Sequence, residues 1–328
     1  MNVIIDNIRL MLEKICRLKP GQNLLIIADN YARSISAARI IADVANSMGI
    51  QAVFTVMEQR AHRGQEPPPS ISVAMKVVDV VLEVGEKSNV GHTNSRKEAT
   101  EAGARYYVLN PEFCEDHSRN PISVEDLNTI KKRTEKLAEI TTRANIARVT
   151  TPYGTDITMS LKGRQAIPVH PLNDMGFAII PDYAEAAISP VEGTTEGVVV
   201  VDASVRGWGY VLREPIRFEV KEGRIRVETV SSGIAEDAEK FKSLILFDEN
   251  ATNCAAELGQ GTSHIVPKTL RGDFLSDCGI AGTVHIAVGR NNDIGGETWS
   301  QIHYDVLMTR PTVKLDDTYV IENGELKI

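Results

Sequence analysis

Short apolar runs alternate with longer amphipathic segments over the first 146 residues. The runs are rich in Val, Ile and Leu, which is typical of strands buried on both faces of a parallel sheet. The amphipathic segments carry apolar residues at helical spacing, and Gly49 and Gly103 end two of them. The predicted strands are 23–29, 51–57, 77–84 and 104–110, and the predicted helices are 3–18, 32–49, 93–103 and 123–144. This alternation predicts an α/β domain with a parallel sheet over residues 1–146.

After residue 146 the pattern changes from helical spacing to strands and tight turns. Segment 147–163 predicts a β-hairpin that turns at Tyr153-Gly154, and EVKEGRIRV predicts a second that turns at Glu222-Gly223. The runs GVVVVDASV and TVHIAVG predict further strands. Residues 147–328 are therefore predicted to form a second domain of α+β type, mostly antiparallel β with few helices.

Composition excludes several classes of function. The chain has 328 residues, 42% of them hydrophobic, and a formal net charge of −8. A negative balance without a basic patch argues against nucleic acid and anionic membranes as partners. No apolar run is long enough to span a membrane, and the charged residues spaced through the first segment lead us to expect no signal peptide there. The four cysteines lack CxxC spacing, so we expect a cytoplasmic protein with free, ordinarily buried thiols.

Two strand-like segments near the C-terminus carry side chains that bind metals. In IHYDVLM, alternation places His303 and Asp305 on one face of a strand. In TVHIAVG, His285 shares a face with two small residues, which leave space around it. A loop with a Gly-Gly pair joins the segments and allows them to lie together. Two imidazoles and a carboxylate are suitable ligands for a divalent metal, whereas the alternative is a surface strand whose polar residues face water.

Two glutamates interrupt small or apolar residues in the same half of the chain. Glu257 follows two alanines and precedes a Gly-x-Gly turn, and Glu185 is flanked by alanines. Alternatively, Glu257 lies at a helix end capped by Gly259, and Glu185 on an exposed edge strand. Together with the histidines and Asp305, these residues have the composition of a two-metal hydrolytic site.

The segments PDYAEAAISPVEGTTEG, AELGQGT, GTVHIAVGRNNDIGG and SQIHYDVLM, in this order, resemble the aminopeptidase T family of metallopeptidases (M29). The resemblance implies a Rossmann-like first domain, a second domain with one or two divalent ions (Zn, Co or Mn), and a homodimer. It implies a peptide or small-amide substrate. The sequence departs from that family at residues 290–292, Arg-Asn-Asn, where the family carries a tyrosine. The implied metal ligands are Glu185, Glu257, His285, His303 and Asp305, with Glu185 also a candidate catalytic residue.

The closing His-x-Asp is also similar to that of the 2,5-dihydroxypyridine dioxygenases, ring-cleaving enzymes that use Fe(II). That resemblance implies His303 and Asp305 as iron ligands and His92 as a catalytic acid or base. The sequence differs from those enzymes at Glu257, where they carry a histidine. His92 precedes a predicted helix, so the alternative is a residue that caps the helix N-terminus.

Other catalytic signatures are missing from the sequence. It contains no complete P-loop, no G-x-G-x-x-G after the first strand and no G-x-S-x-G, so we expect no bound nucleotide or dinucleotide and no serine nucleophile. The leading hypothesis is a metal-dependent hydrolase of the M29 aminopeptidase type. The alternatives are a mononuclear Fe(II) dioxygenase and a metal-free binding or structural dimer.

Overall fold

The computed structural model describes residues 3–60, 65–85, 90–91, 93–110, 112–118, 120–174, 176–272, 277–292 and 294–328. The chain divides into two compact units. The first comprises Met1–Lys131 and His170–Asp182, and the second comprises Lys132–Val169 and Tyr183–Ile328. The second unit thus begins inside helix α6 (Val124–Arg143), ahead of the predicted boundary at residue 146.

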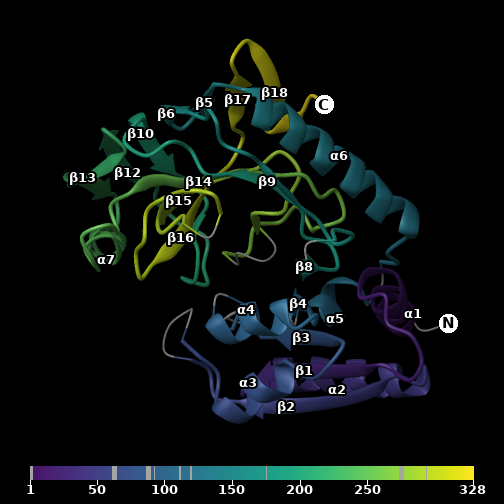
Figure 1. Ribbon diagram of the computed structural model, residues 1–328. Coiled ribbons are helices and arrows are strands. Elements are labelled where there is room, and N and C mark those ends of the chain that lie inside the picture. The colour runs from purple at the N-terminus through teal and green to yellow at the C-terminus, as the bar shows by residue number, and fades with distance from the viewer. Residues whose placement is uncertain are drawn as a thin grey trace. The chain divides into compact units, whose positions relative to one another are not determined.

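The first unit is built on a parallel sheet of five strands, in the order β2-β1-β3-β4-β8 (Figure 1). Helix α2 packs against β1, β2 and β3. The strands are β1 (Asn23–Asp29), β2 (Gln51–Met57), β3 (Val80–Val84), β4 (Arg105–Leu109) and β8 (Phe177–Ile180). The helices are α1 (Val3–Leu10), which continues as the π-helix η1 (Met11–Ile15), α2 (Ala32–Ser47), α3 (Pro69–Met75), α4 (Asn94–Glu101) and α5 (Phe113–Asp116). The four strands predicted for residues 1–146 are confirmed, whereas β8 was not predicted.

The second unit contains two antiparallel sheets. Sheet B has the order β13-β12-β10-β6-β5-β17-β18-β19, and sheet C has the order β11-β16-β15-β14-β9-β7. Sheet B contains β5 (Ile146–Thr150), β6 (Asp156–Ser160), β10 (Glu196–Val201), β12 (Ile216–Lys221), β13 (Arg224–Ser232), β17 (Thr312–Leu315), β18 (Thr318–Glu322) and β19 (Glu325–Leu326). Sheet C contains β7 (Ile167–Val169), β9 (Glu185–Ile188), β11 (Ser204–Val205), β14 (Cys254–Gly261), β15 (Val284–Gly289) and β16 (His303–Met308).

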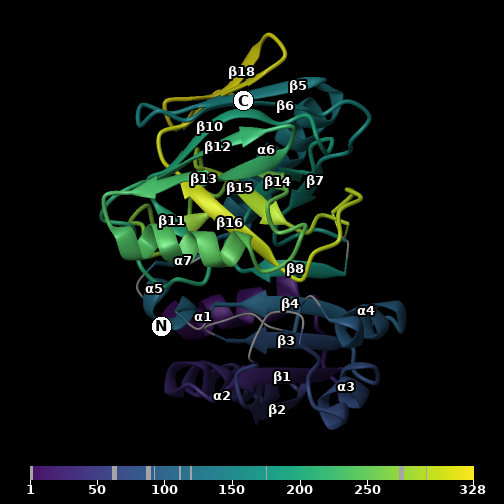
Figure 2. The same cartoon turned by 90° about the vertical axis from the view of Figure 1, so that its left-hand side faces the viewer.

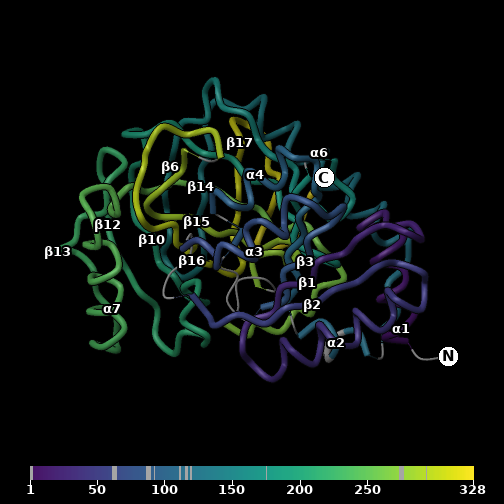
Figure 3. The backbone as a smooth tube through the Cα atoms, turned by 60° about the horizontal axis from the view of Figure 1, so that its bottom comes forward, coloured from purple at the N-terminus to yellow at the C-terminus, as the bar shows by residue number. Residues whose placement is uncertain are grey.

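Both predicted hairpins are present in sheet B. Strands β5 and β6 pair around Tyr153-Gly154, and β12 pairs with β13 around Glu222-Gly223. Glu222 and Gly223 both have positive φ, 51° and 68°, as a two-residue hairpin turn requires. Helix α7 (Ala235–Ile245) packs against β13, and it lies beside β12 and β13 in Figure 3.

The hydrophobic core of the second unit draws on both of its sheets. Ile157 and Phe218 enter it from sheet B, and Leu258, Ile286 and Val306 enter it from sheet C. Beyond the register shift that precedes Glu257 in β14, and throughout β15 and β16, the core residues are even-numbered, so the odd-numbered side chains there lie on the opposite face. Among the helices of the described ranges, none has the length and apolar character needed to cross a membrane.

Candidate metal centre

Five potential metal ligands lie on one face of sheet C, the face directed away from the core. Strand register explains this arrangement, because residues directly opposite each other project from the same face of a sheet. His285 lies opposite Gly259, Glu257 and Asp305 both lie opposite Ala287, Glu185 lies opposite Gly261, and His303 lies opposite Gly289. The neighbouring strands β14, β15 and β16 are visible in Figure 2.

Small residues between the donors provide the space that the donors occupy. A Cβ atom at Gly259 would lie 2.0 Å from Cε1 and 2.1 Å from Nε2 of His285, so the imidazole lies directly over this glycine. Ala187 faces Gly259 from β9, and Ala287 lies between Glu257 and Asp305 on β15. A side chain larger than glycine at position 259 would therefore displace the ring of His285 from the donor cluster.

The donors form two groups that share one carboxylate. Glu185, Glu257 and His285 form one group, called here the Glu185 half-site. Glu257, His303 and Asp305 form the other, called the Asp305 half-site. In each half-site one donor atom from every residue lies within 4.8 Å of the others. Glu257 belongs to both, which is the arrangement expected of a carboxylate that bridges two ions.

Short distances within the cluster link the imidazoles to the carboxylates. Nε2 of His285 lies 3.3 Å from Oε2 of Glu185 and 3.7 Å from Oε1 of Glu257. Nε2 of His303 lies 3.2 Å from both Oε2 of Glu257 and Oδ1 of Asp305. The two oxygens of Glu257 are thus directed to different histidines.

The cluster is buried, and its charge needs a partner. Glu185, Glu257 and Asp305 are 6%, 7% and 2% exposed. Oε2 of Glu185 and Oδ1 of Asp305 are buried without an aligned hydrogen-bond donor among the described residues. Three carboxylates in so small a volume are costly unless cations compensate them. Carboxylate and imidazole donors, two of them with unmatched oxygens, fit one or two divalent metal ions.

Burial and the neighbouring imidazoles shift the pKa values of Glu185 and Glu257 in opposite directions. Burial raises the pKa of Glu185 to about 8, although His285 pulls it downward. Burial would also raise the pKa of Glu257, but hydrogen bonds from His285 and His303 outweigh burial and lower it to about 2. Glu257 therefore carries a negative charge at the centre of the cluster at neutral pH.

Asp305 and His303 hold opposite charges when no cation is bound. Burial would raise the pKa of Asp305, but the guanidinium of Arg206 and the imidazole of His303 hold that pKa far below its usual range. Burial would lower the pKa of His303, but Asp305 and Glu257 raise it to about 10. A proton on the imidazole thus balances the carboxylates, and a divalent ion would displace this proton on binding.

Several residues around the donors were not predicted from the sequence. Arg206 donates from Nη1 to Oδ2 of Asp305 at 2.8 Å. The phenol of Tyr183 lies beside Glu185 and lowers its pKa. Cys278, expected to be an ordinary buried cysteine, hydrogen-bonds His285. Arg206 and Cys278 reach the cluster from other segments, so spacing along the chain does not reveal them, whereas Tyr183 lies two residues before Glu185 and alternation could have indicated it.

The structure also orients the ring of His303. Its Nδ1 lies 2.6 Å from the backbone carbonyl of Arg290. Because a carbonyl only accepts, Nδ1 carries the hydrogen of this bond, and Nε2 faces Glu257 and Asp305. This orientation is usual for a histidine that ligates a metal through Nε2.

The structure decides between the alternatives considered for the five donors. Glu257 lies inside strand β14 and not at a helix end, so the capped-helix alternative is wrong. Glu185 is buried in β9, which pairs with both β14 and β7, so the exposed-edge alternative is also wrong. His303 and Asp305 face the donor cluster and not solvent. His92 lies outside the described residues, and its predicted role stays a prediction.

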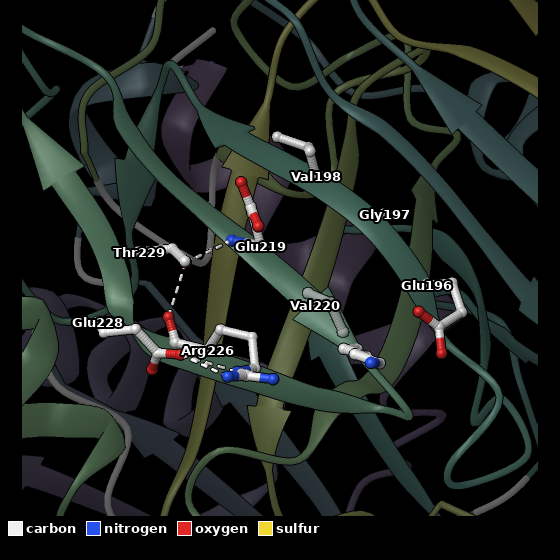
Figure 4. Close-up of a pocket in the computed structure, with 9 residues that line it drawn as sticks. Glu196, Gly197, Val198, Glu219, Val220, Arg226, Glu228 and Thr229 are labelled. Atoms are coloured by element: carbon white, nitrogen blue, oxygen red, sulfur yellow. Dashed lines mark hydrogen bonds and ion pairs between the residues drawn. The ribbon is translucent and has the colours of Figure 1, made fainter.

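A separate hollow lies on sheet B. It has a volume of about 570 Å³ and is open to solvent, over strands β10, β12 and β13 (Figure 4). Arg226 and Glu228 pair across its floor at 2.7 Å, and the hydroxyl of Thr229 accepts from the backbone of Glu219 at 2.9 Å. None of the five donors lines it. The hollow is therefore not the metal centre.

Comparison with known proteins relates the whole chain to two structures. The chain is similar to 2,5-dihydroxypyridine dioxygenase from Pseudomonas putida KT2440, with 16% identity over 98% of this chain and 97% of that one, and a TM-score of 0.78. It is similar to wild-type AmpT from Thermus thermophilus, with 17% identity over 99% of each chain and a TM-score of 0.73. None of the curated proteins matches the sequence.

These likenesses confirm the predicted fold, an α/β unit with a parallel sheet followed by a mostly antiparallel unit of aminopeptidase T type. At such low identity they establish the fold alone. The family model described as 2,5-dihydroxypyridine 5,6-dioxygenase, NicX, matches residues 5–328. The chain therefore belongs to the 2,5-dihydroxypyridine 5,6-dioxygenase (NicX) family.

Proposed function

We propose that the protein is a metal-dependent hydrolase that cleaves an amide bond in a peptide or a small amide. The observation that carries the proposal is the pair of half-sites that share Glu257. A shared carboxylate between two sets of donors is the arrangement that holds two ions close together in hydrolytic enzymes. Similarity to AmpT in fold is consistent with this function.

The donor types favour borderline divalent ions. Each half-site offers two carboxylates and one imidazole, which suit Zn, Co or Mn. When bound, such ions supply Lewis acidity toward a carbonyl oxygen and a lowered pKa for water. Glu257 would hold both ions, with Glu185 and His285 completing one half-site and His303 and Asp305 the other.

Glu185 is the residue we assign to proton transfer. Its Oε2 is buried without an aligned hydrogen-bond donor among the described residues, and its pKa, which burial raises to about 8, allows the carboxyl group both to take up and to return a proton near neutral pH. In the proposed reaction a water oxygen attacks the carbonyl carbon, and Glu185 accepts the proton that this water loses. As the C–N bond breaks, Glu185 returns that proton to the leaving nitrogen.

A second candidate function is favoured by the family match over residues 5–328. It is ring cleavage by a single Fe(II) ion, with His303 and Asp305 as ligands and His92 as acid or base. Such oxygenases generally bind iron with two histidines and one carboxylate. Each half-site here holds one histidine and two carboxylates, so this chemistry would need Glu257 as its third ligand.

The two functions are tested on the same purified protein. Protein loaded with Zn, Co or Mn is assayed against a panel of aminoacyl amides and small amides. A second sample is loaded with Fe(II) under anaerobic conditions. Its oxygen uptake is then measured in aerated buffer that contains 2,5-dihydroxypyridine. We expect amide hydrolysis that disappears in the double variant H303A/D305A. Oxygen uptake without amide hydrolysis would contradict the hydrolase and support the second candidate.

The double variant also tests the metal-free alternative. If H303A/D305A folds normally, as judged by circular dichroism, loss of activity is attributable to the donors. If the wild-type protein lacks both activities with every metal, and the variant binds the same small molecules equally well, the protein is a binding module and not an enzyme.

A further inference from the structure

The two half-sites differ in how firmly their side chains are held. Apart from the shared Glu257, each contributes one carboxylate and one imidazole. Metal ligands bind more tightly when neighbouring groups fix their orientation, because less ordering remains to be done when the ion arrives. The neighbours of each half-site therefore bear on the order in which ions bind.

Asp305 and His303, the two donors that belong to the Asp305 half-site alone, are each held by a hydrogen-bond partner. Nη1 of Arg206 donates to Oδ2 of Asp305 at 2.8 Å, and the backbone N–H of Arg206 donates to the carbonyl of Asp305 at 2.9 Å. Oδ1 of Asp305 is left facing Nε2 of His303 at 3.2 Å. The carbonyl of Arg290 fixes the His303 ring from behind at 2.6 Å.

The side chains identified beside the Glu185 half-site are uncharged hydrogen-bond partners. The phenol of Tyr183 hydrogen-bonds Glu185, and Oε2 of Glu185, like Oδ1 of Asp305, has no aligned donor within the described part of the chain. His285 has the thiol of Cys278 as a hydrogen-bond partner, and sulfur is a weak donor and acceptor. The Glu185 half-site thus has a phenol and a thiol in the places where the Asp305 half-site has a guanidinium and a backbone carbonyl.

We infer that Arg206 is a positioning residue that makes the Asp305 half-site the first to fill. This inference rests on the proposed dinuclear site and adds an order of loading to it. Arg206 is 8% exposed and pairs with an Asp305 that is 2% exposed, so the clamp is shielded from water. The positive charge of Arg206 also repels a bound cation, which weakens ion binding, whereas its orientation of Asp305 strengthens ion binding. The affinity of a variant at Arg206 shows which of the two effects is larger.

The order of loading is measured by titrating Mn²⁺ into metal-free protein by calorimetry. We expect two classes of site in the wild type. The tighter class should be lost in D305N and the weaker class in E185Q. In R206M the tighter class should weaken by about 10- to 100-fold, as is typical when a group that orients a ligand is removed. R206K, which keeps the charge and one donor, should weaken it less.

Arg148 provides a matched control. It pairs with Asp156 through two hydrogen bonds of 2.8 and 2.7 Å, the same chemistry as the Arg206 clamp, but on sheet B. R148M should leave both classes unchanged. If R206M does not fold, the order of loading in the wild type, assigned through D305N and E185Q, still tests the inference.

Other results separate this inference from the proposed function. Two classes of equal affinity, loss of the tighter class in E185Q, or tighter binding in R206M would overturn the inference and leave the dinuclear site standing. A single ion that is lost in D305N and weakened in R206M would support the role of Arg206 and contradict the dinuclear hydrolase. Protein that binds no ion would contradict both.

Discussion

The imidazole of His285 lies directly over Gly259 on the neighbouring strand, where a Cβ would come within 2.0 Å of its Cε1 atom. We predict that G259A displaces this ring and costs about 1–3 kcal/mol of stability through overpacking. It should also reduce the metal content of the protein. Urea unfolding of G259A checks the stability, and elemental analysis checks the metal.

A double-mutant cycle provides the control for G259A. If the cost comes from the His285 ring, G259A should cost little in an H285A background, because the clash is gone. An equal cost in both backgrounds would show that the glycine is needed for another reason.

Substitutions of the three carboxylates should remove different numbers of ions. Glu257 belongs to both half-sites, so E257Q should lose both ions, whereas E185Q and D305N should each lose one. Metal counts per chain after removal of excess ion check this. E219Q, on the hollow of sheet B, is the control and should retain both ions. Retention of an ion in E257Q with loss of both in D305N would contradict the shared role of Glu257.

Asn291 should stabilise the loop between β15 and β16. Its Nδ2 donates to Ser189 at 2.8 Å and to Glu192 at 2.7 Å, and its Oδ1 accepts from the backbone of Thr298 at 2.8 Å. N291A should therefore lower the free energy of unfolding by about 2–4 kcal/mol, since it removes three hydrogen bonds, one of them to the buried hydroxyl of Ser189 and two to part-buried groups. The exposed Asn292 is the matched control, and N292A should change stability by less than about 0.5 kcal/mol.

Removal of metal should destabilise the second unit. An ion that binds the native state stabilises it by about 2.7 kcal/mol when its free concentration is 100 times its Kd. We predict that a chelator lowers the thermal midpoint of the wild type and lowers that of E257Q much less. The chelator concentration must be high enough to remove the metal from the protein. If the thermal midpoint of the wild type does not change at that concentration, the ions do not stabilise the fold.

Much of the fold was predictable because local patterns decide it. The buried parallel strands β1 to β4 appear as apolar runs, and the turn at Glu222-Gly223 is encoded by two adjacent residues. The first helix was predicted to continue to residue 18, but regular α-helix ends at Leu10 and a π-helical turn follows to Ile15. Strand β8 was missed because it is four residues long and follows a loop, and its pairing with β4 is set by the tertiary fold.

The donor cluster was predictable in its members but not in its grouping. Alternation along the strand placed His303 and Asp305 together, small and apolar neighbours singled out Glu185 and Glu257, and motif resemblance then implied all of them as metal ligands. Which donors share an ion depends on register between strands, which a single sequence does not reveal. Arg206 was missed for the same reason, because only the pairing of β11 with β16 brings it to Asp305. The homodimer, the cytoplasmic location and the role of His92 stay predictions.

The most direct test of the dinuclear site is the number of ions that each chain binds. Metal-free wild-type protein is loaded with Mn²⁺, freed of excess ion and analysed for manganese and protein concentration. Two ions per chain is the predicted result, because two half-sites share Glu257. One ion per chain, unchanged by higher Mn²⁺ concentration and by replacement with Zn²⁺ or Co²⁺, would contradict the dinuclear hydrolase.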